Sequence, residues 1–215
     1  MTSDNVSLDA DNAGPVKVCA IAGGSGAGKT TLAKLLLERL GADATHLTID
    51  WYYRDLAHLT PAERATVNFD HPDSLEVDLF AHHLGTLASG QQIEAPVYDF
   101  ATHTRTAEVL PVRAHDYIVT EGIHLLGLEE VRPHYSLGVF IDVDSQIRLE
   151  RRIRRDIAER GRTEESVRAQ WMETVAPMHD QFVQPSRQFA ERVVTIDDDF
   201  NAVADELAAR LRDAG

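Results

Sequence analysis

The fold is decided by the stretch GGSGAGKT, Gly23–Thr30, which matches the pattern G-x-x-x-x-G-K-[ST] at every fixed position. An apolar run at residues 16–22 precedes this stretch, and residues 30–40 place apolar side chains at helical spacing. A strand, a glycine-rich turn and a helix in this order form a phosphate-binding loop, because backbone N–H groups and the helix N-terminus attract negative charge. We therefore expect the loop to hold the β- and γ-phosphates of a nucleoside triphosphate.

The side chains of this loop have separate expected roles. Lys29 is expected to reach the outer phosphates, and the Thr30 hydroxyl is placed to bind Mg²⁺. The residues expected to contact the nucleotide are Gly23, Gly24, Ser25, Gly26, Ala27, Gly28, Lys29, Thr30 and Thr31. The loop alone does not distinguish a kinase from a GTPase or an ATPase motor. A GTPase would carry the guanine-reading N-K-x-D, which this sequence lacks, and a motor would usually be longer.

The rest of the chain alternates strand-like runs with helical patterns. Strands are expected at 44–49, 117–120, 137–143 and 192–196, and helices at 75–88, 147–159, 164–179 and 202–211. This alternation predicts an α/β fold with a mainly parallel five-stranded sheet and helices on both faces. The runs at 93–97 and 106–112 are expected to pair as a β-hairpin. The expected organisation is a flexible tail (1–15), then one domain (16–215) with a hairpin insertion (about 91–112) and an arginine-rich segment (about 148–168).

The composition limits the partners of the protein. Its 215 residues are 43% hydrophobic and 26% charged, which is ordinary for a soluble globular protein. No apolar run is long enough to span a bilayer, and the polar start lacks the features of a signal peptide. The single cysteine, Cys19, fits a reducing cytoplasm. We expect a cytoplasmic protein that binds no membrane and, at a formal net charge of −14, no nucleic acid.

A basic cluster interrupts this acidic chain. Eight arginines fall between Arg148 and Arg168, and Arg148, Arg152 and Arg155 share one face of the expected helix. Such a cluster predicts a local anion site. An exposed helix whose arginines pair with neighbouring acids such as Asp156 is the simpler alternative.

Two carboxylates follow expected strands. Asp50 ends the run at 44–49, and Glu121 follows the run at 117–120. The carboxyl ends of parallel strands meet at a ligand-binding crevice. There, Asp50 could accept a proton from an attacking hydroxyl, and Glu121 and Asp50 could bind Mg²⁺. An Asp in a turn and a surface Glu are the simpler alternatives.

Over roughly residues 16–200, the sequence resembles the uridine kinase family, also called uridine–cytidine kinases. The resemblance rests on GGSGAGKT, IDWYYRD (49–55), NFDHPDS (68–74), PVYDFATHTR (96–105), TEGIH (120–124) and RRIRRDIAERGR (151–162). Many proteins share the phosphate loop, whereas NFDHP followed by Y-D-F-x-x-H-x-R is far more restrictive. The resemblance implies the P-loop kinase fold and, with Mg²⁺, transfer of the ATP γ-phosphate to the 5′-hydroxyl of a pyrimidine nucleoside, as in pyrimidine salvage.

The resemblance also implies roles in an acceptor site. Asp50 resembles the base that activates the 5′-hydroxyl, and Asp70 resembles the group that binds the ribose hydroxyls. The residues that match the family's base pocket are Tyr98, Phe100, His103 and, as a further candidate, Tyr53. Without the resemblance, Asp70 would be interpreted as a helix cap and the aromatic residues as core.

The arginine run resembles the family's lid, which supplies positive charge and excludes water. By resemblance, Arg152 and Arg162 face the nucleoside and the phosphate, and Arg155 and Arg160 face ATP. Gln170 matches a glutamine that contacts the substrate.

Some other positions fit the sequence pattern of the family less closely. Asp199, before the last helix, falls where the family approaches the nucleotide. Trp51 stands where the family has a smaller or more polar residue, and Glu191 stands where it usually has Asp. We expect Trp51 to reshape the acceptor site, which leaves the substrate more open than the reaction type. A homotetramer is implied by the resemblance alone.

Other functions stay open at the level of sequence. A sister P-loop kinase could act on ribulose 5-phosphate, pantothenate or nicotinamide riboside, although a phosphorylated acceptor would favour basic residues where this chain has aromatic ones. A nucleotide-dependent switch without phosphotransferase activity would not need Asp50 and Glu121. A nucleic-acid-binding role would favour aromatic residues among the arginines of 148–162, and that segment has none.

Overall fold

A parallel sheet forms the centre of the computed structural model, which describes residues 15–213. The strands are β1 (Lys17–Gly23), β2 (Ala44–Thr48), β5 (Tyr117–Glu121), β6 (Leu137–Ile141) and β7 (Arg192–Val194). Their order is β2-β5-β1-β6-β7, and every neighbouring pair is parallel. The predicted α/β fold with a five-stranded parallel sheet is confirmed. Apart from Pro15, the tail expected at 1–15 lies outside the described residues.

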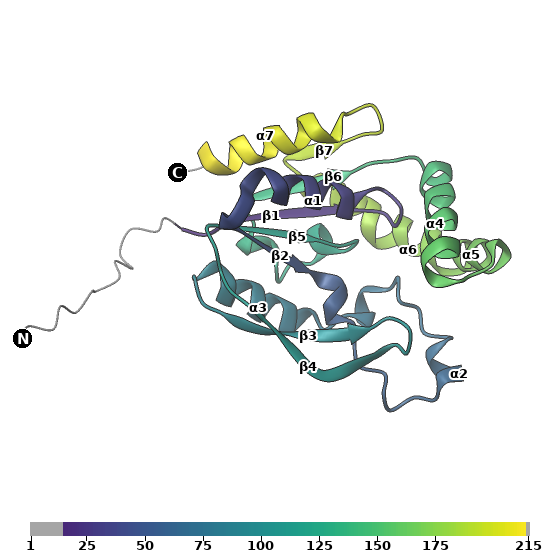
Figure 1. Ribbon diagram of the computed structural model, residues 1–215. Coiled ribbons are helices and arrows are strands. Elements are labelled where there is room, and N and C mark those ends of the chain that lie inside the picture. Colours follow the sequence, from purple (N-terminus) through teal and green to yellow (C-terminus); the bar gives the residue numbers. More distant parts are fainter. Residues whose placement is uncertain (1–14, 214–215) are drawn as a thin grey trace, which may run out of the picture.

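Helices cover both faces of this sheet (Figure 1). The three that pack on it are α1 (Lys29–Leu40), α3 (Val77–Ala88) and α7 (Phe200–Asp213). On β1, Cys19 and Ile21 face the core with α1 and α7, whereas Val18 and Ala20 face the core with α3. Because both faces of β1 are buried, its sequence is almost entirely apolar. Within residues 15–213, no helix combines the length and the hydropathy that crossing a membrane requires.

The helix α7 is joined to α1, the helix that follows the phosphate loop. Arg39 of α1 donates from Nε to Asp205 Oδ1 of α7 at 2.8 Å. Arg212 of α7 donates to the backbone oxygen of Arg39 at 2.6 Å. Phe200, the first residue of α7, lies so close to Gly28 that a Cβ there would come within 3.0 Å of its ring.

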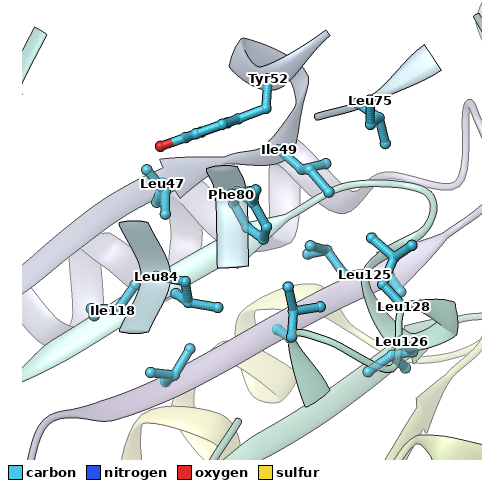
Figure 2. Close-up of a cluster of buried hydrophobic side chains, with 14 of the residues drawn as sticks. Leu47, Ile49, Tyr52, Leu75, Phe80, Leu84, Ile118, Leu125, Leu126 and Leu128 are labelled. Carbon is cyan, nitrogen blue, oxygen red and sulfur yellow. The ribbon is translucent and has the colours of Figure 1, made fainter. Parts of the chain in front are cut away.

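The core between the sheet and α3 fixes the segment that follows β2 (Figure 2). The 3₁₀ turn Ile49–Tyr52 buries both of its end residues in the same cluster as Phe80 of α3. The rings of Tyr52 and Phe80 meet edge to face with centroids 5.0 Å apart, and the Tyr52 hydroxyl lies 2.9 Å from His83 Nδ1. The strand expected here ends one residue early, so Asp50 stands on the turn and not at the strand end.

The predicted hairpin is present outside the main sheet. Its antiparallel strands are β3 (Ile93–Asp99) and β4 (Thr104–Val112). Both strands are longer than the apolar runs that predicted them. The register shifts between Pro96 and Tyr98, where a β-bulge re-aims the side chains that follow.

Short helical segments connect these elements. The helix α2 (Pro61–Arg64) was not expected from the sequence, and it begins at a capping box formed by Thr60 and Glu63. The 3₁₀ segments are Gly41–Asp43, Ile49–Tyr52, Pro72–Ser74, Leu125–Gly127, Arg132–His134 and Gln184–Phe189. The segment Pro72–Ser74 delays the start of α3, which was expected at residue 75.

Two helices form the arginine-rich segment. These are α4 (Ser145–Arg160) and α5 (Glu164–Gln170). Gly161 follows α4 in a left-handed conformation, with φ 62°, and turns the chain toward α5. The break expected between these helices is confirmed.

The helical run after α5 is not uniformly α-helical, as the sequence had suggested. It continues as a π-helical turn (Trp171–Val175), α6 (Ala176–Met178) and a second π-helical turn (His179–Val183). Pro177 lies in this run and has no N–H for an α-helical hydrogen bond. The wider π-helical turns on either side of α6 accommodate the proline, which cannot donate an α-helical hydrogen bond. Such turns are frequent at functional sites.

Candidate active site

A cavity of about 810 Å³ lies at the carboxyl ends of β1, β2 and β5. Ser25, Lys29 and Thr30 line the cavity from the loop after β1. Asp50 lines it from the turn after β2, and Glu121 lines it from the end of β5. Parallel strands end at the same edge of a sheet, and this arrangement brings the predicted phosphate and carboxylate residues together.

Hydrogen bonds join the phosphate loop to the two carboxylate positions. Thr30 Oγ1 donates to Glu121 Oε1 at 3.3 Å. Thr48 Oγ1 lies 3.4 Å from the same carboxylate oxygen and accepts from the backbone N–H of Asp50 at 3.3 Å. The last residue of β2 therefore orients both Glu121 and the turn that carries Asp50.

Burial sets the charge balance of this wall. Burial, and then the nearby charge of Glu121, raise the pKa of Asp50 to about 6. Burial lowers the pKa of Lys29, while the charges of Glu121 and Asp50 oppose that shift. Lys29 Nζ donates to the backbone oxygen of Gly24 at 3.1 Å. A carboxylate whose pKa approaches the working pH is suited to accept a proton.

Another part of the cavity wall is aromatic. Tyr53, Tyr98 and Phe100 form a cluster, with ring centroids 5.5 Å apart for Tyr53–Tyr98 and 5.2 Å apart for Tyr98–Phe100. His103 has φ 56° and stacks on Phe69 with centroids 4.4 Å apart. Tyr98 Oη is buried and has no hydrogen-bond partner in the described part of the chain. Burial raises the pKa of Tyr98 to about 12, so the phenol keeps its proton and can donate it to a ligand.

Asp70 is a buried carboxylate in the cavity wall. Thr174 Oγ1 donates to its Oδ2 at 3.0 Å, and His124 Nε2 donates to its backbone oxygen at 2.9 Å. Burial lowers the pKa of His124 to about 4, so its ring is neutral at pH 7. Side chains from two separate segments thus hold Asp70 in one orientation.

The lid residues expected from the sequence meet at the same cavity. Arg152, Arg155, Arg160, Arg162 and Gln170 all line it. Arg152 donates to Ser25 Oγ at 2.8 Å and to Gln170 Oε1 at 2.9 Å. Arg162 donates to the same Gln170 oxygen. Gln170 therefore ties two lid arginines together, and Arg152 ties them to the phosphate loop.

A buried carboxylate lies among the lid guanidiniums. Asp156 has an exposed fraction of 0%, and its oxygens lie 2.8 Å from Arg155 and 3.5 Å from Arg162. Arg152 and Arg160 lie 3.6 and 3.8 Å from it. Asp156 is not part of the cavity wall, so the guanidiniums stand between it and the cavity. The pairing expected in the simpler alternative is therefore present at Asp156, but Arg152 and Asp156 are buried and not on an exposed helix face.

Some positions singled out in the sequence lie elsewhere. The side chains of Thr31 and Asp199 do not line the cavity, and Asp199 Oδ1 accepts from the backbone N–H of Asn201 at 3.0 Å. Trp51 packs beside His46 of β2, with ring centroids 6.2 Å apart. Trp51 is not among the described residues that line the cavity, so its effect on the acceptor site stays a prediction.

The remaining loop residues, Gly23, Gly24, Gly26, Ala27 and Gly28, turn the chain from β1 into α1 and are not in the cavity wall. Gly26 has φ 81°, and a Cβ there would come within 2.3 Å of the backbone oxygen of Arg148. Only glycine fits this position. Glu191, the other departure, accepts from the backbone N–H of Gly138 at 2.5 Å and secures the start of β6.

Sequence reasoning missed several residues of the site. Phe69 and Ile123 line the cavity, and both lie inside the blocks NFDHPDS and TEGIH, where their apolar character could have marked them. Asp156 was considered only as a pairing partner, although it is an acid in the middle of the arginine run. Thr174 carried no signal, because its approach to Asp70 depends on the π-helical turn.

The donors at the phosphate end fit the magnesium ion that the fold implies. Mg²⁺ takes oxygen ligands and is usually bound by one or two carboxylates together with substrate phosphates and water. Thr30, Asp50 and Glu121 offer a hydroxyl and two carboxylates of this kind beside the phosphate loop.

Comparison with known proteins gives a consistent result. The sequence profile of the Phosphoribulokinase / Uridine kinase family matches residues 18–199. A uridine kinase of Chloroflexus aurantiacus is 43% identical over 175 residues, which cover 81% of this chain and 84% of that protein. A uridine kinase of Halobacterium salinarum is 42% identical over 193 residues, which cover 90% of this chain and 85% of that protein.

The fold has relatives among solved structures. The phosphoribulokinase of Rhodobacter spheroides superposes with a TM-score of 0.64 at 15% identity, over 86% of this chain and 72% of that chain. At this identity the likeness shows the fold alone. The family match and the identities above confirm the resemblance inferred from the sequence. The chain is an ATP-dependent kinase that belongs to the phosphoribulokinase/uridine kinase family.

Proposed function

We propose that this kinase transfers the γ-phosphate of ATP to the 5′-hydroxyl of a pyrimidine nucleoside, uridine or cytidine, with the help of Mg²⁺. The observation that carries the proposal is one cavity whose wall combines a phosphate loop, two carboxylates, an aromatic cluster and Asp70. The uridine kinases that are 42% and 43% identical to the chain point to the same acceptor class.

The acceptor end suits a nucleoside. The ring faces of Tyr53, Tyr98 and Phe100 can stack on a flat base. The unpartnered Tyr98 hydroxyl can donate to the C2 carbonyl oxygen, which uracil and cytosine share. The Asp70 carboxylate can accept from two vicinal ribose hydroxyls. None of these groups requires the acceptor to carry a phosphate.

In the proposed reaction, Asp50 accepts the proton of the 5′-hydroxyl. The hydroxyl oxygen forms a bond to the γ-phosphorus while the bond from that phosphorus to the β–γ bridging oxygen breaks, and ADP leaves. Lys29 and the lid guanidiniums stabilise the charge on the transferred phosphoryl group. Because its pKa is raised to about 6, Asp50 is a stronger base than an exposed aspartate and is still ionised at pH 7. When bound, Mg²⁺ held by Thr30, Glu121 and Asp50 would neutralise phosphate charge.

The test is a panel of acceptors assayed with ATP and Mg²⁺. We expect uridine and cytidine to give nucleoside monophosphate, with kcat/KM far above that for ribulose 5-phosphate, pantothenate or nicotinamide riboside. Turnover of uridine and cytidine no faster than ATP hydrolysis would reject the pyrimidine assignment. Turnover of one of the other acceptors would then assign the chain to a sister kinase.

Three further properties stay predictions that this cavity does not address. They are the homotetramer implied by the resemblance, the cytoplasmic location, and the single domain at 16–215. Sedimentation of the purified protein would test the first.

A further inference from the structure

The first turn of α4 places a buried cation behind the phosphate loop. Arg148 is 4% exposed, and its Nε donates to the backbone oxygen of Val143 at 2.9 Å. Within residues 15–213, its Nη1 has no hydrogen-bond partner and no carboxylate forms an ion pair with it, although the nearby charges of Asp180, Asp144 and Asp142 favour the charged guanidinium. Asp142 is paired with Arg187 instead, and Asp144 caps α4. Because a buried charge is costly unless it is paired, this arrangement destabilises the free protein.

The guanidinium lies directly against the backbone of the loop. A Cβ added to Gly24 would come within 2.3 Å of Arg148 Nη1 and within 2.9 Å of His179 Nδ1. Gly26 packs on the backbone oxygen of the same arginine. The Trp171 ring, 5.3 Å from Arg148 Cζ, completes the enclosure. Two glycine positions of the loop are therefore shaped around one residue.

His179 does not supply the missing counter-charge. Its Nε2 donates to Gln184 Oε1 at 3.0 Å, and its Nδ1 is buried without a partner in the part of the chain that the structure describes. Burial, and then the charge of Arg148, lowers the pKa of His179 to about 4. The ring is therefore neutral at pH 7 and forms no ion pair with Arg148.

We propose that Arg148 is a positioning residue whose buried, unpaired charge acts through the phosphate loop to stabilise the bound β-phosphate of the nucleotide. The cavity is lined by Ser25, Lys29 and Thr30, and Arg148 is not part of its wall, so the guanidinium touches no ligand. Inside a protein the effective dielectric is low, and a charge still acts on a group beyond its contact distance. The bound phosphate adds its negative charge to those of Asp180, Asp144 and Asp142, none of which forms an ion pair with Arg148. This inference concerns the donor and holds whichever acceptor the kinase uses.

The substitution Arg148→Met tests the inference, because it removes the charge and keeps an apolar side chain of similar length. We expect the Kd for ADP, measured by calorimetry, to rise about tenfold, which corresponds to about 1.4 kcal/mol. The Kd for AMP, which has no β-phosphate, should change less than about twofold. The Tm of the nucleotide-free variant should equal or exceed that of the wild type, because the unpaired buried charge is gone.

Arg154→Met is the matched control. It removes the same charge from the same helix, but this side chain is 77% exposed and pairs with Glu150 across 3.8 Å. Its Kd for ADP should stay within about twofold of the wild type, since surface charges contribute little.

Two outcomes would overturn the inference: an Arg148→Met protein that binds ADP as tightly as the wild type, or one that loses ADP and AMP affinity equally. If Arg148→Met does not fold, Arg148→Lys replaces it. Arg148→Lys retains the charge and should keep the Kd for ADP within about threefold. A tenfold loss in a folded Arg148→Lys protein would show that shape matters and charge does not, and would also overturn the inference.

Discussion

The phosphate end and the acceptor end of the cavity are built in different ways. Ser25, Lys29 and Thr30 come from one loop, whose shape depends on the backbone and on adjacent residues. The acceptor end combines Tyr53, Asp70 and residues of the hairpin, which meet only in the finished fold. The difference teaches that the phosphate loop can be recognised from local sequence, whereas the acceptor end can be recognised only from tertiary packing.

The two ends also differ in charge. The phosphate end is buried and charged, with carboxylates and guanidiniums at hydrogen-bond distance from neighbours. The acceptor end is mostly neutral and aromatic, and Phe100 remains 48% exposed. Substitutions at one end should therefore change the kinetics of one substrate and leave those of the other.

The largest effect is expected where the two ends meet. Asp50→Asn removes the proposed base and keeps the shape of the side chain, so kcat should fall by about 10²–10⁴. The Kd for ATP, measured by calorimetry, should hardly change, because the phosphate loop is intact. Wild-type turnover in Asp50→Asn would remove this residue from the role of base.

The pH dependence of the wild type is the control for that substitution. With its pKa raised to about 6, Asp50 is protonated below that pH and cannot accept a proton. The kcat/KM of the wild type should therefore fall about tenfold per pH unit below about pH 6. The residual activity of Asp50→Asn should not follow that slope.

A smaller effect on the kinetics is expected from substitution of Asp156, the buried carboxylate of the lid. Asp156→Asn leaves guanidiniums clustered around a neutral group, and breaking a buried ion pair in this way costs about 3–5 kcal/mol. We expect urea denaturation to show this loss of unfolding free energy, and steady-state kinetics to show a raised KM for ATP.

Glu164→Gln is the matched control for Asp156→Asn. It breaks the ion pair with Arg168, 2.7 Å long, in which both side chains are about half exposed. Such pairs contribute about 0.2–1 kcal/mol. Equal losses of stability in the two variants would show that Asp156 is no more than an ordinary surface partner.

The smallest effect is expected at the acceptor end. Phe100→Ala removes one ring of the aromatic cluster, and base–aromatic stacking contributes about 1–3 kcal/mol. The KM for uridine should rise by about fivefold or more, with the KM for ATP unchanged. If the KM for ATP rises equally, the two ends are not independent and the comparison fails.

At the phosphate end, the sequence predicted which segments meet at the cavity, although only Ser25, Lys29 and Thr30 of the nine loop positions expected to contact the nucleotide line it. The fixed positions of the loop set its conformation, and strand-end carboxylates at Asp50 and Glu121 followed from the strand pattern. Even there, the exact support of Asp50 was missed, because the turn Ile49–Tyr52 depends on burial of Tyr52 against α3. Local patterns give the type of element, and packing decides where it ends.

The acceptor end was predicted only through the family resemblance. Alternation on the hairpin placed Tyr98 and Phe100 together, but no local pattern brings Phe69 onto His103 or Thr174 to Asp70. Local sequence also fails to predict the position of the Trp51 side chain. Asp50, the residue before it, lines the cavity, yet the Trp51 ring packs beside His46.

The ion pair between Arg39 and Asp205 has a consequence for how the protein is made. These residues are 166 positions apart, so the ribosome must add all of the intervening chain before α1 can be covered by α7. Until then, the outer surface of α1 is exposed to water or to chaperones, although its own loop was synthesised early.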